Sequence, residues 1–234
     1  MNRNVKITAI LTSVIAIAAL VVGVVLLRPG SGDDGADAAA KGGNGENVTI
    51  PTAPAPADPQ ALRPDTYRLS TAPNDKVNLV EFLDFECEAC GALYPLMEEL
   101  RTKYDGKVTF GIRYFPITSH FNAERAARAV EAAAQQGEVE AMYKKMYDTQ
   151  KQWAEQQEPK DDLFRSYAEE IGLDMKAYDK AYTSQQTLDR IAKDVAEGKA
   201  LGVQGTPTLF LNGKKLEPKS GQDLVAAIDK ALAQ

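Results

Sequence analysis

The chain has very little cysteine and histidine. Its 234 residues include two cysteines, Cys87 and Cys90, and one histidine, His120. Once the two cysteines pair with each other, no structural disulfide remains for the rest of the chain. A structural zinc site usually takes four protein ligands, and these three side chains do not complete one. We therefore expect no metal ion and no cofactor, and a cysteine pair that is free to change its redox state.

The chain also lacks a strong charge of one sign. It carries 27 basic and 33 acidic residues, for a net charge of −6. No basic block occurs after the N-terminal region, whereas nucleic-acid-binding proteins usually concentrate lysine and arginine on one face or stretch. The composition therefore argues against a nucleic-acid partner.

Only one long apolar run is present. It covers Ile7 to Leu27 without a charge, and at ~1.5 Å per residue it matches the ~30 Å hydrocarbon core of a bilayer. Arg3 and Lys6 precede it, so the positive-inside rule predicts a cytoplasmic N-terminus and an extracytoplasmic remainder. We expect residues 1–28 to be a signal anchor, that is, an N-terminal transmembrane helix.

A cleaved signal peptide is the alternative for this segment. Signal peptides usually have a shorter apolar region, of about 7 to 15 residues, and a small-residue cleavage site close behind it. The nearest loose match, Ala36-Asp37-Ala38, lies well past the apolar end. No cysteine follows the run directly, which excludes a lipoprotein anchor.

Residues 29–65 are rich in Gly, Ala, Pro, Asp and Ser and have few large apolar side chains. Such a segment cannot bury enough surface to offset its conformational entropy, so it predicts a flexible linker. The remaining residues, 66–233, are enough for one well-packed domain.

Within 66–233 the pattern predicts an α/β fold with an inserted helical subdomain at about 119–183. A buried strand at 77–85 leads into an amphipathic helix that begins at Cys87, and helical periodicity dominates from 122 to 182. The other expected elements are strands at 67–69 and 108–117, a helix at 184–201, a hairpin at 208–216 with an Asn-Gly turn, and a closing helix at 224–232.

The two cysteines lie three residues apart at the start of the predicted helix. The unsatisfied N–H groups and the positive end of the helix dipole favour a thiolate on the first cysteine and lower its pKa. This predicts Cys87 as the attacking sulfur and Cys90 as the resolving thiol. A pair of inert core cysteines is the alternative.

The tetrad Cys87-Glu88-Ala89-Cys90, the helical block and Gly205-Thr206-Pro207-Thr208 together resemble the DsbA-like branch of the thioredoxin superfamily. The resemblance covers about residues 66–233 and implies a thioredoxin-like fold. It also implies that Pro207 is a cis-proline packed against the cysteines, and that Thr206, Pro207, Glu88 and Ala89 contact the substrate. A trans proline entering a strand is the alternative for Pro207.

Glu81 lies six residues before Cys87, where thioredoxin-like proteins commonly carry a buried acid. Burial would raise its pKa and suit it to proton exchange with Cys90. The alternative is a charged residue at a strand edge.

The dipeptide between the cysteines differs from the Pro-His of strongly oxidising relatives. Glu88, and Glu86 nearby, should raise the pKa of Cys87 relative to a His-containing tetrad. We therefore predict a reduction potential between the superfamily's limits of about −270 and −120 mV.

The sequence says less about the function of the single histidine and of the aromatic residues in the helical block. A histidine before a helix is more often structural, and a functional role would place His120 at the active-site rim. Tyr143, Tyr147 and Trp153 fit the core of the helical block better than a substrate groove.

The predicted function is that of a membrane-anchored, extracytoplasmic thiol:disulfide oxidoreductase. Its substrates would be reduced exported proteins, and the resemblance implies a membrane redox partner of the DsbB or VKOR type. Two alternatives stay open, namely a reductase or isomerase of the same fold and a non-catalytic binding or chaperone module for exported chains.

Overall fold

This computed structural model describes residues 49–234. The predicted anchor at 1–28 and the first part of the predicted linker lie outside the described residues. None of the helices in the described part combines the length and apolarity that a bilayer crossing requires.

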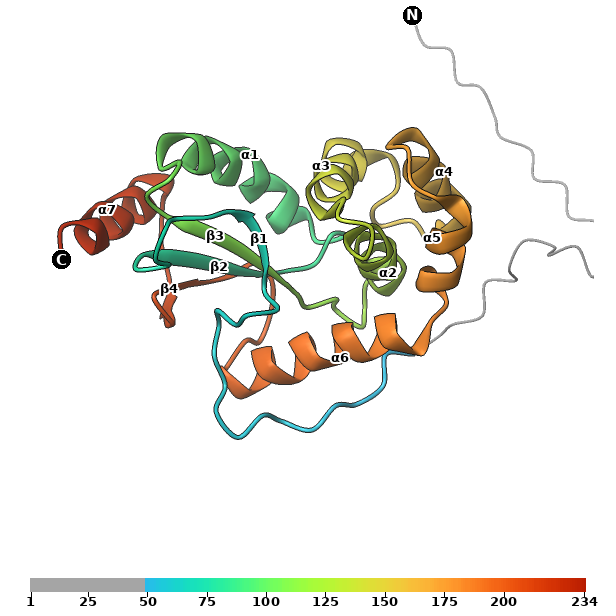
Figure 1. Cartoon of the computed structure of the whole chain (residues 1–234), viewed down its shortest axis with the longest axis horizontal. Coiled ribbons are helices and arrows are strands. Elements are labelled where there is room, and N and C mark those ends of the chain that lie inside the picture. Colours follow the sequence, from blue (N-terminus) through green and yellow to red (C-terminus); the bar gives the residue numbers. More distant parts are fainter. Residues whose placement is uncertain (1–48) are drawn as a thin grey trace, which may run out of the picture. The chain divides into compact units, whose positions relative to one another are not determined.

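A five-stranded sheet in the order β1-β3-β2-β4-β5 forms the centre of the fold (Figure 1). β2 and β3 are parallel, and the other neighbours are antiparallel. β2 lies between β3 and β4, and its side chains are buried from Leu79 onward, which explains its nearly continuous apolar sequence. The strands are β1 (Tyr67–Ser70), β2 (Asn78–Leu83), β3 (Thr109–Tyr114), β4 (Thr208–Leu211) and β5 (Lys214–Leu216).

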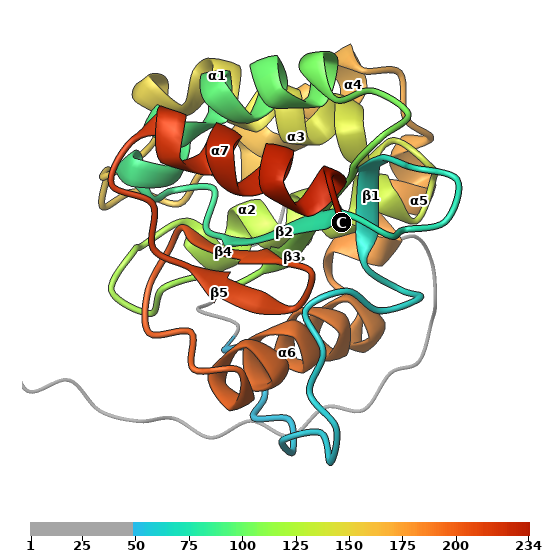
Figure 2. The same ribbon diagram turned by 90° about the vertical axis from the view of Figure 1, so that its left-hand side faces the viewer.

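Helices cover both faces of this sheet. α1 (Glu88–Lys103) and α7 (Gly221–Leu232) lie on one face and α6 (Gln185–Ala200) lies on the other (Figures 1 and 2). On the α6 side, Gly198 permits close approach, because a Cβ there would lie 2.9 Å from the Phe115 ring. The result is a three-layer arrangement with a separate apolar core on each side of the sheet.

The helical insertion packs at the end of the sheet where β2 leads into α1 (Figure 1). It comprises α2 (Ala123–Ala134), α3 (Val139–Thr149), the short η1 (Gln150–Gln152), α4 (Asp161–Glu170) and α5 (Met175–Tyr182). The small side chains of α2 let α3, α4, α5 and α6 pack around it. Tyr143, Tyr147 and Trp153 are buried in this block, as the sequence predicted.

The folded unit begins before residue 66, where the composition had placed a flexible linker. Ala61 is only 1% exposed. The backbone N–H of Gln60 donates to Glu197 Oε1 at 2.9 Å, and Arg63 forms an ion pair with the same carboxylate. These contacts use backbone groups, one alanine and one arginine, so a segment with few large apolar residues is nevertheless held against α6.

Candidate active site

The cysteine pair lies where β2 ends and α1 begins. Cys87 is the N-cap residue of α1, with extended backbone angles and no side-chain capping bond. The N–H groups of the first helical turn therefore remain available to its sulfur. Cys87 is 8% exposed and Cys90 is 1% exposed, and both are free thiols.

The two sulfurs have opposite acidities. The pKa of Cys87 is lowered to about 5, chiefly because the Cys90 thiol donates a hydrogen bond to it. Thr206 and the backbone N–H groups of Cys90 and Ala89 add to this effect, against the opposing effect of burial. The pKa of Cys90 is raised by burial, by its bond to Cys87 and by the charge of Glu81. Cys87 is thus the thiolate and Cys90 the protonated partner.

Thr206 approaches Cys87 from the loop before β4. The Cys87 sulfur lies 3.3 Å from the Thr206 carbonyl oxygen, so a protonated Cys87 donates to this carbonyl. The Thr206 hydroxyl is buried and has no partner within hydrogen-bonding geometry, yet its side chain lowers the pKa of Cys87. A thiolate accepts a hydrogen bond more strongly than a thiol does, so a hydroxyl close to the Cys87 sulfur favours the charged form.

Pro207 follows Thr206 through a cis peptide bond. This is the isomer that the resemblance implied, and the Thr206 carbonyl that precedes the bond lies next to Cys87. The trans alternative is wrong.

Glu81 is a buried acid in the middle of the sheet. It is 2% exposed and is paired in register with Ile112 on β3 and Leu209 on β4. The alternative of a strand-edge charge is therefore wrong. Burial, and then the negative charge of Cys87, raise the pKa of Glu81 to about 8. Glu81 is close enough to the pair to influence Cys90, and it can hold or release a proton near neutral pH.

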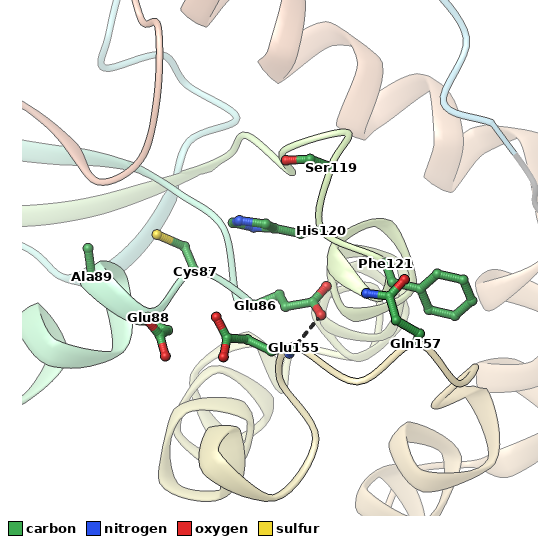
Figure 3. A pocket seen from close by; sticks show the side chains of 9 residues that line it. All are labelled: Glu86, Cys87, Glu88, Ala89, Ser119, His120, Phe121, Glu155 and Gln157. Carbon is green, nitrogen blue, oxygen red and sulfur yellow. Dashed lines mark hydrogen bonds between the residues drawn. The ribbon is translucent and has the colours of Figure 1, made fainter.

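A cavity of about 370 Å³, here called the active-site cavity, opens beside Cys87 (Figure 3). Glu88 and Ala89, both exposed, lie on the α1 side of it. The opposite wall comes from the insertion and the loop before it, and the complete lining is Glu86, Cys87, Glu88, Ala89, Ser119, His120, Phe121, Glu155 and Gln157.

Glu86 does not point at the Cys87 sulfur. Its carboxylate accepts hydrogen bonds from the backbone N–H group of Asn122 and from that of Glu155, the second of which is drawn in Figure 3. The sequence predicted that Glu86 and Glu88 would both raise the pKa of Cys87. In the structure Glu86 holds the loops of the insertion in place, and Glu88 is exposed beside the cavity.

Sequence reasoning gave little weight to His120 and did not single out Asp84. Asp84 is 1% exposed, and one of its carboxylate oxygens lies 2.7 Å from His120 Nδ1. This bond is the main reason why the pKa of His120 is raised. The sequence does show Asp84 as an acid at the end of a buried strand, three residues before Cys87. Nothing in the sequence links it to a histidine 36 residues away.

Gln150 is a second residue that the sequence did not reveal. Its side-chain amide donates to the carbonyl oxygens of Phe85 at 2.7 Å and of Cys87 at 2.9 Å. A Cβ on Gly91 would lie 1.9 Å from Gln150 Oε1. Gln150 thus connects the insertion to the backbone of the cysteine loop, and Gly91 leaves the space that this requires.

Comparison with known proteins agrees with this geometry. The family model described as Thioredoxin matches residues 69–230. A thioredoxin-like oxidoreductase from Silicibacter pomeroyi is 25% identical, with a TM-score of 0.62, covering 74% of this chain and 95% of that one. Wolbachia pipientis alpha-DsbA1 is 19% identical, with a TM-score of 0.64, covering 74% and 93%.

Curated relatives of higher identity are much longer proteins. The Na(+)/H(+) antiporter NhaA 3 of Salinispora tropica is 36% identical over 159 residues, which is 67% of this chain and 23% of the antiporter. The chain thus spans about a quarter of the length of that relative. With a thioredoxin match over most of its length, and a fold shared with a DsbA protein around its two neighbouring cysteines, the chain belongs to the thioredoxin family.

Proposed function

We propose that this oxidoreductase forms disulfide bonds in exported proteins through a Cys87–Cys90 dithiol/disulfide cycle. The observation that carries the proposal is the placement of the two sulfurs at one helix N-terminus, the first at an open cavity and the second buried behind it. Cys87, with its pKa lowered to about 5, borders the active-site cavity, whereas Cys90 is buried with its pKa raised. This arrangement gives one sulfur to the substrate and keeps the other inside.

In the oxidising direction a substrate thiolate attacks the Cys87 sulfur of the disulfide form. The Cys87–Cys90 bond breaks, a mixed disulfide forms at Cys87, and Cys90 leaves and takes up a proton. Glu81, with a pKa near neutral, is the proton source. A second substrate thiolate then attacks the substrate sulfur of the mixed disulfide, and Cys87 leaves as a thiolate. The substrate is oxidised by two electrons and the enzyme is reduced by two.

The low pKa of Cys87 supports this direction. A low-pKa thiol is a better leaving group, and a stabilised thiolate makes the reduced enzyme the more stable form. Both effects favour transfer of the disulfide to the substrate. The dipeptide Glu88-Ala89 is acidic, whereas strongly oxidising tetrads contain a histidine that stabilises the thiolate. This difference supports a reduction potential between about −270 and −120 mV.

The residues around the cavity supply a substrate site in this proposal. Thr206 and Pro207 present backbone next to Cys87, and a substrate chain would lie along this loop. Glu88 and Ala89 are exposed at the start of α1 and would contact the residues that flank the substrate cysteine.

We place the catalytic domain outside the cytoplasm, attached through the apolar segment Ile7 to Leu27. The support is the length of this run and the basic residues before it. Each cycle leaves the enzyme reduced by two electrons, so a membrane redox partner of the DsbB or VKOR type would restore the disulfide.

Trapping of mixed disulfides tests the proposal. In Cys90→Ala, Cys87 has no resolving thiol, so complexes with exported proteins should accumulate as bands that disappear on reduction. The double variant Cys87→Ser/Cys90→Ala is the matched control and should trap none. Absence of linked partners in Cys90→Ala would contradict the exchange function, and purified enzyme that reduces insulin but fails to oxidise a reduced test protein would contradict its direction.

A further inference from the structure

His120 lies across the active-site cavity from the tetrad. It comes from the loop between β3 and α2, and its ring extends toward Cys87 (Figure 3). The side chain is 34% exposed, so it lies on the cavity wall and not in the core. It is the only histidine of the chain, and the exchange cycle described above does not use it.

Asp84 fixes the orientation of this ring. Its carboxylate is fully buried and accepts hydrogen bonds from the backbone N–H groups of Glu86 at 2.8 Å and Ile117 at 2.9 Å, besides its contact with His120 Nδ1. These bonds join the loop before Cys87 to the loop that carries His120. With Nδ1 donating to Asp84, Nε2 is the nitrogen left for the cavity.

The charges around His120 favour a protonated ring. Asp84, Glu86 and Cys87 each contribute to raising its pKa. Glu88 and Glu155 also line the active-site cavity. His120 also lines a neighbouring cavity together with Glu124 and Arg125, and Arg125 forms an ion pair with Asp161. The groups that face the ring are therefore mostly acidic.

We propose that His120, oriented by Asp84, is the cation that stabilises the Cys87 thiolate, a role that the Glu88-Ala89 dipeptide cannot fill. The positive charge comes from a loop beside the insertion and not from within the tetrad. When the disulfide is reduced by two electrons, Cys87 then remains an anion paired with imidazolium, and only Cys90 takes up a proton. This inference rests on the proposed exchange function, because the stabilised thiolate is the species that exchange produces.

The direct test is a titration of the Cys87 thiolate by its ultraviolet absorbance in the reduced protein. His120→Gln keeps a hydrogen-bond donor for Asp84 and removes the charge. The apparent pKa of Cys87 should rise by about one unit. The equilibrium with glutathione should shift by about tenfold toward oxidised enzyme, which is about 30 mV for a two-electron couple. Ser119→Ala, an exposed neighbour on the same wall, should leave both values unchanged.

A second measurement needs no variant. Interacting groups shift one another's titration, so the pKa of His120, followed by NMR of the wild-type ring, should be higher in the reduced than in the oxidised enzyme. Asp84→Asn should lower the pKa of His120 in both states. A Cys87 titration unaltered in His120→Gln, or a pKa of His120 that is the same in both redox states, would overturn the inference. Failure of the exchange function would instead appear as an absence of trapped partners in Cys90→Ala with these titrations as expected.

Discussion

Two thiols on the first turn of one helix differ in acidity because their surroundings differ. Cys87 accepts a hydrogen bond from Cys90 and from N–H groups that the helix leaves unsatisfied, whereas Cys90 is buried, donates to Cys87 and lies near the acid Glu81. Charge is thus concentrated on the sulfur at the cavity. Glu81 is the group that, in the proposed cycle, supplies the proton of the buried Cys90 thiol.

Replacing Glu81 with Gln should stabilise the reduced protein at alkaline pH. The pKa of Glu81 rises from 4.5 to about 8 on folding, so between these values the unfolded state binds fewer protons and stability falls as pH rises. The loss is up to ~1.4 kcal/mol per pH unit. Glu81→Gln removes this term, and urea unfolding of both proteins at about pH 5 and pH 8 should show the variant gaining stability relative to wild type at the higher pH.

The matched control is Glu99→Gln, on an exposed position of α1, which should show no such pH-dependent gain. A Glu81→Gln variant whose stability follows wild type at both pH values would contradict a buried carboxyl with a raised pKa.

At this scale the sequence predicted some site residues and missed others for a definable reason. Cys87 and Cys90 are marked by their spacing on one helix turn, and Glu81 and Pro207 by a resemblance. Asp84 with His120, and Gln150 with the Cys87 carbonyl, are contacts across 36 and 63 residues of chain. Only the packing of the insertion against the sheet creates them, and no local pattern encodes that packing.

At the scale of elements, the start of α1 is fastened to the insertion by one side chain. Gln150 follows α3, is buried, and bonds to two carbonyl groups of the cysteine loop. It occupies the space beside Gly91. The helical insertion therefore does more than extend the surface, because it holds the backbone from which Cys87 projects.

The effect of Gly91→Ala on the free energy of unfolding should depend on residue 150: destabilising with Gln150 present and stabilising with alanine there. In the wild type the new methyl group displaces the Gln150 amide and its two hydrogen bonds, which should cost about 1–3 kcal/mol of unfolding free energy. In a Gln150→Ala background the space is open, and the higher helix propensity of alanine should stabilise by up to ~1 kcal/mol. A double-mutant cycle from urea unfolding measures the coupling. Equal effects in both backgrounds would show that Gln150 does not fill this space.

At the scale of the whole molecule, a buried ion network joins distant parts of the chain. Arg113 on β3 is fully buried and pairs with Asp194 and Glu197 of α6. It also donates to the Ala61 carbonyl at 3.3 Å. One guanidinium thus links the central sheet, the helix on its second face and the segment that precedes β1.

Arg113→Met should be among the most destabilising single changes in the domain. It removes the fully buried partner of Asp194 and Glu197, which keep only the less buried Arg190 and Arg63. Breaking a buried ion pair costs about 3–5 kcal/mol. Arg165→Met is the control, because Arg165 makes its ion pairs with Glu169 and Asp179 at the surface, where exposed pairs contribute about 0–1 kcal/mol. Chemical denaturation of both variants gives the comparison. A similar small loss in both would show that the Arg113 network is not an anchor.

The same network explains what sequence patterns could not predict about the whole fold. Periodicity located the buried strands, α1 and the four longer helices of the insertion, because they bury apolar side chains at regular spacing. The exposed β5 was located instead by the Asn-Gly turn before it. The attachment of residues 60–63 rests on polar bonds to Glu197, which leave no apolar stripe to detect. The boundary drawn from composition therefore fell too late in the chain.

The active-site cavity has two walls of different origin. One is the cysteine loop and the start of α1, and the other consists of His120, Glu155 and their neighbours around the insertion (Figure 3). In the proposed function the second wall contributes His120 to the redox chemistry, so only its other exposed positions can change without altering the sulfur pair. Under the proposed exchange function, substitutions at such positions, for example Glu155 or Gln157, would change which substrate chains fit, while the sulfur pair, His120, the buried acid and the Thr206–Pro207 loop stay constant.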